Sequence, residues 1–343
     1  MPALAVADAL AERGATVSFL GTRERAEAEL VPAAGYEIDF LEVRGLDRRN
    51  PIRAAAAAGK ALLAVRVARK LLRARGADAV MGGGGYVAGP AGLAASRLGL
   101  PLVLTEADSH LGITNRLLAR RAHRVCLAFE IPGRTGPLYL HTGRPVPKAI
   151  LEADPGRARE RFGIDAEIPC LLIFGGSQGA RTINEAAAAA FAEREGSDAR
   201  PFHVLHVSGS RDYESIAARV SGASRYTLIE YLPDLGDALA ASDLVLARSG
   251  GSVFEMTAAG RPAVLVPYPY ASANHQHENA RWMADAGAAR VVEDSELTAE
   301  WLEANIAPLL ADAALLERMA LAARSIAKPD AAERIAAEIL SCV

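Results

Sequence analysis

Aromatic residues and cysteines are scarce in this sequence, and both shortages limit the functions it can have. Only 5% of its 343 residues are Phe, Trp or Tyr, so it offers little of the aromatic surface on which unpaired nucleotide bases stack. Cys126, Cys170 and Cys342 are far apart and form no CxxC pair, which favours small buried or terminal apolar residues over metal ligands or disulfide partners. We therefore expect no nucleic-acid partner and no metal site.

Long apolar runs are missing as well. No stretch of about 18 uncharged apolar residues occurs, and the first residues lack the charged segment and apolar core of a signal peptide. We expect a chain that is soluble or peripheral to a membrane, in a reducing cytoplasm. The net charge is -3, but Lys and Arg outnumber Asp and Glu in residues 1–147, and the reverse holds for residues 148–343.

Short apolar runs alternate with helix-like stretches along the whole chain. This alternation predicts an α/β protein with parallel sheets covered by helices on both faces, in which ligands bind at the carboxyl ends of the strands. The strand-like runs are Thr16–Leu20, Ala79–Met81, Leu102–Leu104, Arg124–Ala128, Cys170–Phe174, His203–Val207, Tyr226–Ile229, Leu244–Leu246, Ala263–Val266 and Ala289–Val292.

Helix-incompatible residues at 143–147 divide the chain into two such domains, residues 1–147 and 148–326. A charged helix is predicted over Lys148–Phe162, and an amphipathic helix over Pro329–Leu340. The first helix, Pro2–Leu10, has no strand before it. Two interpretations fit this start: a truncated chain, or a first sheet without its central strand.

The loop after Phe174 has the composition of a diphosphate-binding turn. Glycines let the backbone approach a phosphate, Ser177 adds a hydroxyl, and the helix after Gly179 offers free N–H groups. A tight strand-to-helix connection is the alternative.

A second glycine turn, Arg248–Glu255, again lies between a strand and a helix. Backbone N–H groups of Gly250 to Val253 can hold phosphate, and Glu255 can accept hydrogen bonds from a ribose diol. Arg248 could pair with a phosphate or with a surface acid. The alternative for Glu255 is simple complementation of the helix dipole.

Polar groups suited to sugar hydroxyls follow the strand Ala263–Val266. His275 and Gln276 are the candidates, and Gln276 is favoured. A metal bound by His275 and His277 is the weaker interpretation, because no other His or Cys lies nearby in sequence.

Two further loops in residues 1–147 contain residues that could bind an anion or transfer a proton. Gly82–Pro90 predicts an anion-receiving turn, with tight packing as the alternative. Thr105–His110 holds three ionisable groups, among which Asp108 is a candidate general base, although surface loops often have this composition.

The helix-like segment Ile52–Gly76 is basic and amphipathic. It includes Lys60, Arg66, Arg69, Lys70 and Arg73 among leucines and valines. Docking on an anionic membrane and an ordinary solvated helix are equally compatible with this pattern.

Taken together, these motifs resemble the MurG family. The motifs are Gly82–Pro90, Gly175–Asn184, Arg248–Glu255, Pro267–Tyr270 and His275-Gln276 with Asn279-Ala280, supported by Gly21-Thr22, Leu30–Pro32, Thr114–Ala119 and Ala128-Phe129. The resemblance spans nearly the whole chain.

The resemblance implies a GT-B architecture, with two doubly wound Rossmann-like domains facing a cleft and a C-terminal helix, residues 327–343, that returns to the first domain. It implies transfer of N-acetylglucosamine from its UDP sugar to lipid I, giving lipid II with inversion, at the cytoplasmic face of the bacterial membrane. The family needs no tightly bound cofactor, although a divalent cation can accompany the diphosphate. The basic helix corresponds to the family's membrane-docking patch.

The resemblance also implies site residues. The donor UDP sugar would bind Ser177, Gln178, Leu232, Arg248, Gly250, Gly251, Ser252, Val253, Glu255, His275 and Gln276. The lipid I acceptor would meet Gly83, Gly84, Gly85, Tyr86, Asp108, Asn115 and Arg144.

The chain departs from the family pattern mainly on the acceptor side. The family's first loop, Gly-Gly-Thr-Gly-Gly-His, would precede Pro2, Asp108 stands where the family has Asn, and Pro147 stands where it has Arg. The Arg248–Glu255 loop is one residue short. Two alternatives therefore stay open: a UDP-sugar transferase with another lipid or glycoside acceptor, and a catalytically silent UDP-sugar-binding relative.

Overall fold

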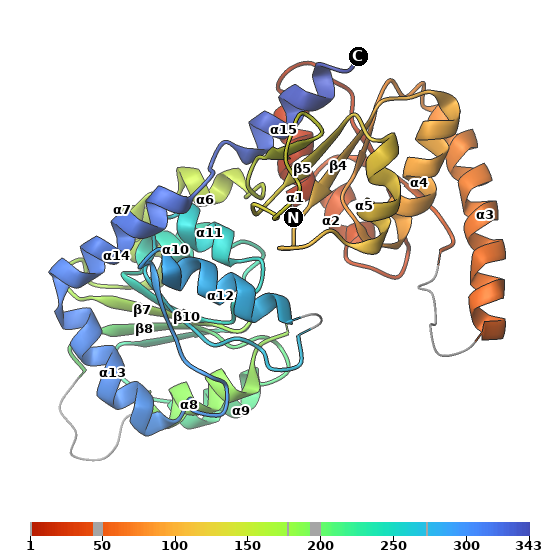
Figure 1. The fold of residues 1–343 in the computed structure, drawn as a ribbon. Helices are drawn as coiled ribbons and strands as arrows, with labels where there is room; N and C mark the ends of the chain where they lie inside the picture. Colours follow the sequence, from red (N-terminus) through yellow and green to blue (C-terminus); the bar gives the residue numbers. More distant parts are fainter. Residues whose placement is uncertain (1, 44–50, 177, 193–199, 272–273) are drawn as a thin grey trace. The chain divides into compact units, whose positions relative to one another are not determined.

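The computed structural model describes residues 2–43, 51–176, 178–192, 200–271 and 274–343, with only the backbone of residues 51–62. The chain folds into two compact units (Figure 1). The first unit is Met1–Pro145 with Pro329–Val343, and the second is Val146–Lys328.

The first unit alternates helices and parallel strands. Its helices are α1 (Pro2–Ala11), α2 (Glu27–Ala33), α3 (Pro51–Ala74), α4 (Gly85–Leu98), α5 (Ile113–Leu118), a 3-10 turn (Ala119–Arg121) and α15 (Ala331–Leu340); its strands are β1 (Ser18–Gly21), β2 (Glu37–Phe40), β3 (Val80–Gly82), β4 (Leu102–Glu106), β5 (Arg124–Leu127) and β6 (Tyr139–His141). In the described residues β1 pairs only with β2, and the other strands form a separate sheet in the order β3-β4-β5-β6.

The first and last helices of the described chain pack together in this unit. Val6 of α1 and Ile335 of α15 are buried with Val103 of β4 in one apolar cluster. An ion pair of 2.8 Å between Arg124 Nε and Glu338 Oε2 adds a link from β5 to α15. The amphipathic pattern of the C-terminal helix is therefore satisfied by α1 and the sheet beneath it.

The second unit is a continuous doubly wound sheet. Its strands are β7 (Cys170–Phe174), β8 (His203–Val207), β9 (Tyr226–Ile229), β10 (Leu244–Ala247), β11 (Ala263–Leu265) and β12 (Ala289–Val291); its helices are α6 (Lys148–Glu152), α7 (Pro155–Phe162), α8 (Arg181–Phe191), α9 (Tyr213–Val220), α10 (Gly236–Ala241), α11 (Val253–Ala258), α12 (His275–Asp285), α13 (Ala299–Ala311) and α14 (Ala313–Ile326). All strand pairs are parallel, in the order β12-β11-β10-β7-β8-β9.

Helices cover both faces of this sheet, with α8, α9 and α13 on one face and α10, α11 and α12 on the other (Figure 1). Leu171, Leu172 and Ile173 of β7 are fully buried, as a central strand packed on both faces requires. The predicted fold class, an α/β protein built from two units with parallel sheets, is confirmed.

One predicted helix is wrong in its length. The charged segment Lys148–Phe162 forms two helices, because the chain turns extended at Ala153 and Asp154 before Pro155. Proline disfavours helical geometry in the residue before it. Asp154 instead caps the new helix, since its Oδ1 accepts a hydrogen bond of 2.8 Å from the Arg157 N–H.

Candidate active site

The strand order of the second unit brings the two predicted glycine turns together. β7 and β10 are neighbours in register, with Phe174 paired to Ala247 at their carboxyl ends. The chain leaves β7 and β10 toward opposite sides of the sheet, so a crevice is expected outside this pair of strand ends. The turns at 175–180 and 248–252 both start there.

The first turn is packed so closely that two of its positions have room only for glycine. A Cβ on Gly175 would lie 2.2 Å from the Ala180 nitrogen, and one on Gly179, whose φ is +73°, would lie 2.1 Å from the Ser208 carbonyl oxygen. Gln178 is exposed on this turn, and its carbonyl accepts a hydrogen bond of 2.9 Å from Arg211. Ser177 lies outside the described residues.

A buried network of polar side chains lies next to the turn at 175–180 and holds the strand end that this turn contacts. The Asn184 amide donates to the Ser208 carbonyl at 2.8 Å and to Asp212 Oδ2 at 3.0 Å. His206 contacts Asn184 Oδ1 at 3.0 Å through Nε2 and the Tyr226 hydroxyl at 2.7 Å through Nδ1. Burial lowers the pKa of His206 to about 3, so the imidazole is neutral at ordinary pH. Asn184 ends the motif Gly175–Asn184 noted from sequence, but the other members of the network, Ser208, Asp212, His206 and Tyr226, were not predicted, because nothing local marks a buried network.

The second turn leaves open space where a ligand would need it. A Cβ added to Gly250 would meet nothing within 4 Å. The Asn279 amide of α12 donates to the Ser249 carbonyl at 2.9 Å, which fixes the start of the turn. Glu255 is half-buried in the first turn of α11, following Gly251, Ser252 and Val253.

Arg248 is buried by protein groups. Its side chain is 10% exposed and its Nη1 lies 2.5 Å from Asp294 Oδ1. The same nitrogen donates to the Val266 carbonyl at 3.2 Å, and the guanidinium lies 5.4 Å from the Tyr268 ring centre. A phosphate and an acid were the two partners considered for Arg248 from sequence, and the acid in contact with it is Asp294.

The third predicted cluster adjoins these turns after β11. The Gln276 Oε1 accepts a hydrogen bond of 2.9 Å from the Tyr268 N–H, and His275 is the half-buried first residue of α12. His277 contacts Glu293 at 3.2 Å. Across the described parts of the chain, no group of three or more His, Cys, Asp or Glu could hold a metal ion.

Leu232 lies in the loop that follows β9 and is half-buried. Its neighbour Tyr231 is 51% exposed and offers an aromatic face at the same edge of the sheet. Tyr231 was not singled out from sequence, although it is an aromatic residue shortly after the predicted strand Tyr226–Ile229.

The glycine turn of the first unit leaves the N-terminus of α4 without a cap from any described side chain. Gly84 and Gly85 have φ values of 78° and 75°. Tyr86 is 53% exposed beside Gly83 and the two other glycines. The Arg25 guanidinium, which the sequence analysis missed, lies 5.3 Å from the Tyr86 ring centre.

The loop after β4 is organised by Glu106 rather than by Asp108. Glu106 is buried, and its carboxylate accepts hydrogen bonds from the Asp108 N–H at 3.3 Å, the Gly112 N–H at 2.8 Å and the Asn115 amide at 2.9 Å. Asn115 is only 2% exposed, so it lies beneath the loop, whereas Asp108 is half-exposed on it.

The other predicted acceptor residue is farther along the sheet. Arg144 is half-buried after β6, at the opposite edge of the sheet from β3. Asp108 and the glycine turn thus follow the neighbouring strands β4 and β3, while Arg144 follows β6 at the far edge.

The predicted basic patch is present on α3. Arg66, Arg69, Lys70 and Arg73 line one shallow hollow, and the Lys60 side chain lies outside the described residues. Apolar side chains are also exposed on α3, at Leu63 and Val67, and on α5, at Ile113 and Leu117. Helix α4 packs between α3 and α5 (Figure 1).

The fold and the glycine turns at its strand ends are those of a two-domain glycosyltransferase. Residues 1–127 match the glycosyltransferase family 28 N-terminal domain, and residues 170–335 match the family 28 C-terminal domain. The crystal structure of MurG from Acinetobacter baumannii matches with a TM-score of 0.77 and 33% identity, covering 99% of this chain and 95% of that one.

Curated relatives agree along the whole chain. A protein of Halorhodospira halophila is 40% identical over 338 residues, 98% of this chain and 92% of its own length. One from Acidithiobacillus ferrooxidans is 42% identical over 344 residues, 99% and 94% of the two lengths. Both are named UDP-N-acetylglucosamine–N-acetylmuramyl-(pentapeptide) pyrophosphoryl-undecaprenol N-acetylglucosamine transferase. The chain belongs to the MurG family of glycosyltransferases.

Proposed function

We propose that this protein transfers N-acetylglucosamine from UDP-N-acetylglucosamine to lipid I, the undecaprenyl-diphospho-muramoyl pentapeptide, and so makes lipid II. The observation that carries the proposal is the pair of glycine turns at the β7–β10 switch point, in a chain that resembles named transferases of this reaction over nearly its full length.

The donor would bind the second unit. The turn at Gly175–Gly179 brings backbone N–H groups within reach of the diphosphate, and Gly250 leaves room for it on the second turn. Glu255 would accept from the ribose diol, and Gln276 with His275 would meet the sugar. Tyr231 and Leu232 would contact the uracil after β9.

The reaction would be a direct displacement. A hydroxyl of the acceptor sugar attacks the anomeric carbon of the donor sugar, the bond to the UDP oxygen breaks, and the configuration inverts. Such a step needs a base for the hydroxyl proton and stabilisation of the UDP leaving group. Asp108 is the candidate base, and the N–H groups of the two donor turns would stabilise the departing diphosphate. Any divalent cation would be held mainly by the diphosphate.

The acceptor diphosphate would bind the glycine turn at Gly83–Gly85. Among the described residues, no side chain caps the first N–H groups of α4 there, and the N-terminus of a helix favours an anion. Tyr86 and the nearby Arg25 would add an aromatic face and a positive charge at the same place.

A membrane-bound acceptor calls for a surface that meets the membrane, and α3 with α5 provides one. On α3, exposed Leu63 lies three and seven residues before the exposed Arg66 and Lys70, and on α5 exposed Leu117 follows the exposed Arg116. This is the mixture that attracts a protein to anionic lipid. Within the described ranges, no helix is long and apolar enough to span a bilayer. The resemblance to the MurG family implies that the protein would act as a peripheral protein on the cytoplasmic face.

A panel of donors tests the proposed reaction. The purified chain is incubated with a soluble lipid I analogue and, in turn, with UDP-N-acetylglucosamine, UDP-glucose and UDP-N-acetylgalactosamine, and the glycosylated product is measured by mass spectrometry. Transfer chiefly from UDP-N-acetylglucosamine supports the proposal. Transfer to other lipid or glycoside acceptors but not to lipid I would replace it with a different transferase.

A further inference from the structure

One carboxylate, that of Asp294, connects the ends of four adjacent strands. Asp294 follows β12, and its Oδ1 lies 2.5 Å from Arg248 Nη1, after β10. Its Oδ2 accepts a hydrogen bond of 3.2 Å from the Thr182 hydroxyl, on the second residue of α8, directly after the β7 turn. The sequence analysis did not single out Asp294 or assign a contact to Thr182.

Arg248 extends the same connection to β11. Its guanidinium donates to the carbonyl oxygens of Val266 at 3.2 Å and Pro267 at 3.4 Å. The sheet order β12-β11-β10-β7 makes these four strands consecutive neighbours. Thus the two residues of one ion pair contact the segments that follow four of the six strands, at the carboxyl edge of the sheet.

Burial makes the pair sensitive to the loss of either partner. The side chains of Arg248 and Asp294 are 10% and 22% exposed. A guanidinium cannot lose its charge in a protein, so Arg248 without its carboxylate would be a buried, uncompensated cation. It would then be expected to move toward water or toward any other anion, and the loops that it holds would move with it.

We propose that Asp294 is a positioning residue of the donor site, which holds Arg248 and Thr182 so that the two glycine turns keep the spacing that the UDP diphosphate requires. The inference rests on the proposed donor site. Asp294 touches no substrate in this account, and it acts through the β7 and β10 turns. Small displacements of such binding groups have large effects on substrate binding and rate.

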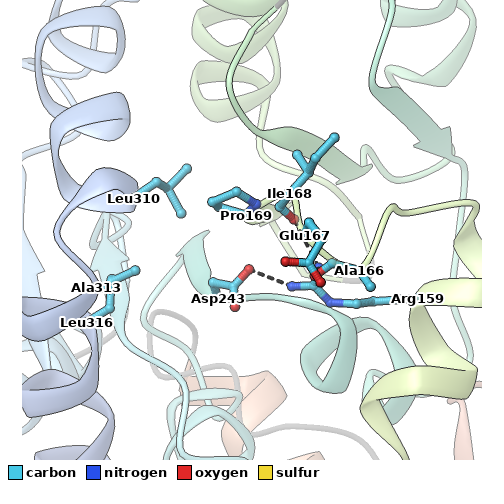
Figure 2. A pocket seen from close by; sticks show the side chains of 9 residues that line it. All are labelled: Arg159, Ala166, Glu167, Ile168, Pro169, Asp243, Leu310, Ala313 and Leu316. Atoms are coloured by element: carbon cyan, nitrogen blue, oxygen red, sulfur yellow. Dashed lines mark hydrogen bonds and ion pairs between the residues drawn. The ribbon is translucent and has the colours of Figure 1, made fainter.

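An ion pair at the amino ends of the strands in the same sheet offers a matched control. Asp243 Oδ2 lies 2.7 Å from Arg159 Nη2 (Figure 2) and accepts a second bond, from the Cys170 N–H, at 2.7 Å. The Arg159 side chain is 15% exposed and the Asp243 side chain is 34% exposed. Asp243 therefore resembles Asp294 in its partners and its burial, but it stands where β10 begins, at the edge away from the glycine turns.

The test compares Asp294→Asn with Asp243→Asn in the full chain. We expect both substitutions to lower the unfolding temperature by similar amounts, and only Asp294→Asn to raise the KM for UDP-N-acetylglucosamine, by about tenfold. The Kd of UDP alone, measured by calorimetry, should rise in parallel, while the KM for the lipid I analogue stays unchanged. Equal changes of donor KM in both variants, or an unchanged or lowered donor KM in Asp294→Asn, would overturn the proposal.

A gentler pair of variants keeps the test decisive if Asp294→Asn does not fold. Thr182→Val removes the hydroxyl that donates a hydrogen bond to Asp294, whereas Thr182→Ser keeps this hydroxyl. We expect Thr182→Val to raise the Kd of UDP several-fold and Thr182→Ser to restore it. Equal UDP affinity in the two variants would count against Asp294. Failure of the wild-type chain to bind UDP would instead refute the proposed donor site itself.

Discussion

The Glu255 side chain tests the donor site at the scale of a single residue. It is half-buried in the first turn of α11, where its carboxylate would accept two charge-assisted hydrogen bonds from a ribose diol. Each such bond contributes about 1.5–3 kcal/mol. We expect Glu255→Ala to raise the KM for UDP-N-acetylglucosamine by more than about tenfold, with little change in the unfolding temperature.

Glu255→Gln serves as the control, since it keeps the shape and weakens only the acceptor. It should fall between the wild type and Glu255→Ala in donor KM. Normal affinity for the UDP sugar in Glu255→Ala would show that the carboxylate only complements the helix dipole.

His206 gives the protein a predicted loss of stability in acid. Its pKa is lowered by burial from 6.5 to about 3, so the unfolded chain binds a proton at pH values where the folded chain does not. Stability from this group is therefore complete above pH 6.5 and is lost as the pH falls toward 3. At pH 5 the loss amounts to about 2 kcal/mol.

Denaturant unfolding between pH 8 and pH 5 measures this effect, with His206→Gln as the comparison. The variant should be less stable at pH 8 because the network with Asn184 and Tyr226 is altered. Its free energy of unfolding should nevertheless fall less steeply with acid than that of the wild type. Parallel pH profiles would show that other groups account for the acid sensitivity.

Individual site residues were predictable from sequence only where a local pattern marks them. Glycines between a strand and a helix identify the turns at 175–180 and 248–252, because the required backbone is local. The partner of Arg248 was not predictable, since Asp294 lies far along the chain and meets it only through the sheet order. The burial of Asn115 beneath Glu106 depends likewise on contacts that no local pattern records.

Among the elements, α15 is predicted to be essential to the first unit. Ile335 is 1% exposed in the cluster formed with α1 and β4. Replacing a buried isoleucine by alanine removes apolar contacts and leaves a cavity, at a cost of about 2–5 kcal/mol. We expect Ile335→Ala to lower the free energy of unfolding by an amount in this range.

Leu321→Ala provides a matched change on α14, because Leu321 is 55% exposed and leaves no cavity when truncated. It should change the stability by less than about 0.5 kcal/mol. Similar losses for both variants in urea unfolding would mean that α15 is not held by this cluster.

Elements were predictable in proportion to their apolar pattern. Cys170–Phe174, His203–Val207 and Tyr226–Ile229 form strands with the predicted bounds, and the helix expected from Pro2 is α1. The analysis missed β2 (Glu37–Phe40) and β6 (Tyr139–His141), which are short and only partly buried. The charges of Glu37 and Asp39 in β2, and the three-residue length of β6, leave too little apolar pattern to distinguish these segments from loops.

At the scale of the whole molecule, the surface of α3 and α5 should bind anionic vesicles. Leu63 and Leu117 are 58% and 67% exposed, each with exposed cations close in sequence on its own helix, and both attractions are needed for stable peripheral binding. We expect cosedimentation with phosphatidylglycerol vesicles but not with phosphatidylcholine vesicles, weakening as salt is raised.

Two variants separate the apolar from the electrostatic part. Leu63→Ser should reduce vesicle binding at every salt concentration, whereas Arg66→Gln should reduce it mainly at low salt. Leu321→Ser, an exposed leucine on α14, is the control and should bind as the wild type does. Equal binding to neutral and anionic vesicles would contradict the docking role of this surface.

The whole fold was predictable because two independent features agree. Alternating apolar runs predict two parallel sheets, and the ordered motifs give the resemblance to the MurG family that the relatives confirm. In the described residues the strands of the first unit form two separate sheets, which agrees with one interpretation of the sequence, a first sheet without its central strand. The pairing of strands depends on which segments meet in space, and a single sequence records this only through motifs.

The most direct test of the account is transfer itself. The purified chain is mixed with UDP-N-acetylglucosamine labelled in the sugar and with a lipid I analogue, and the products are separated and examined by mass spectrometry and NMR. The account predicts one labelled disaccharide product with inverted anomeric configuration and one equivalent of UDP. Binding of the UDP sugar with no labelled product, at any acceptor concentration, would contradict it.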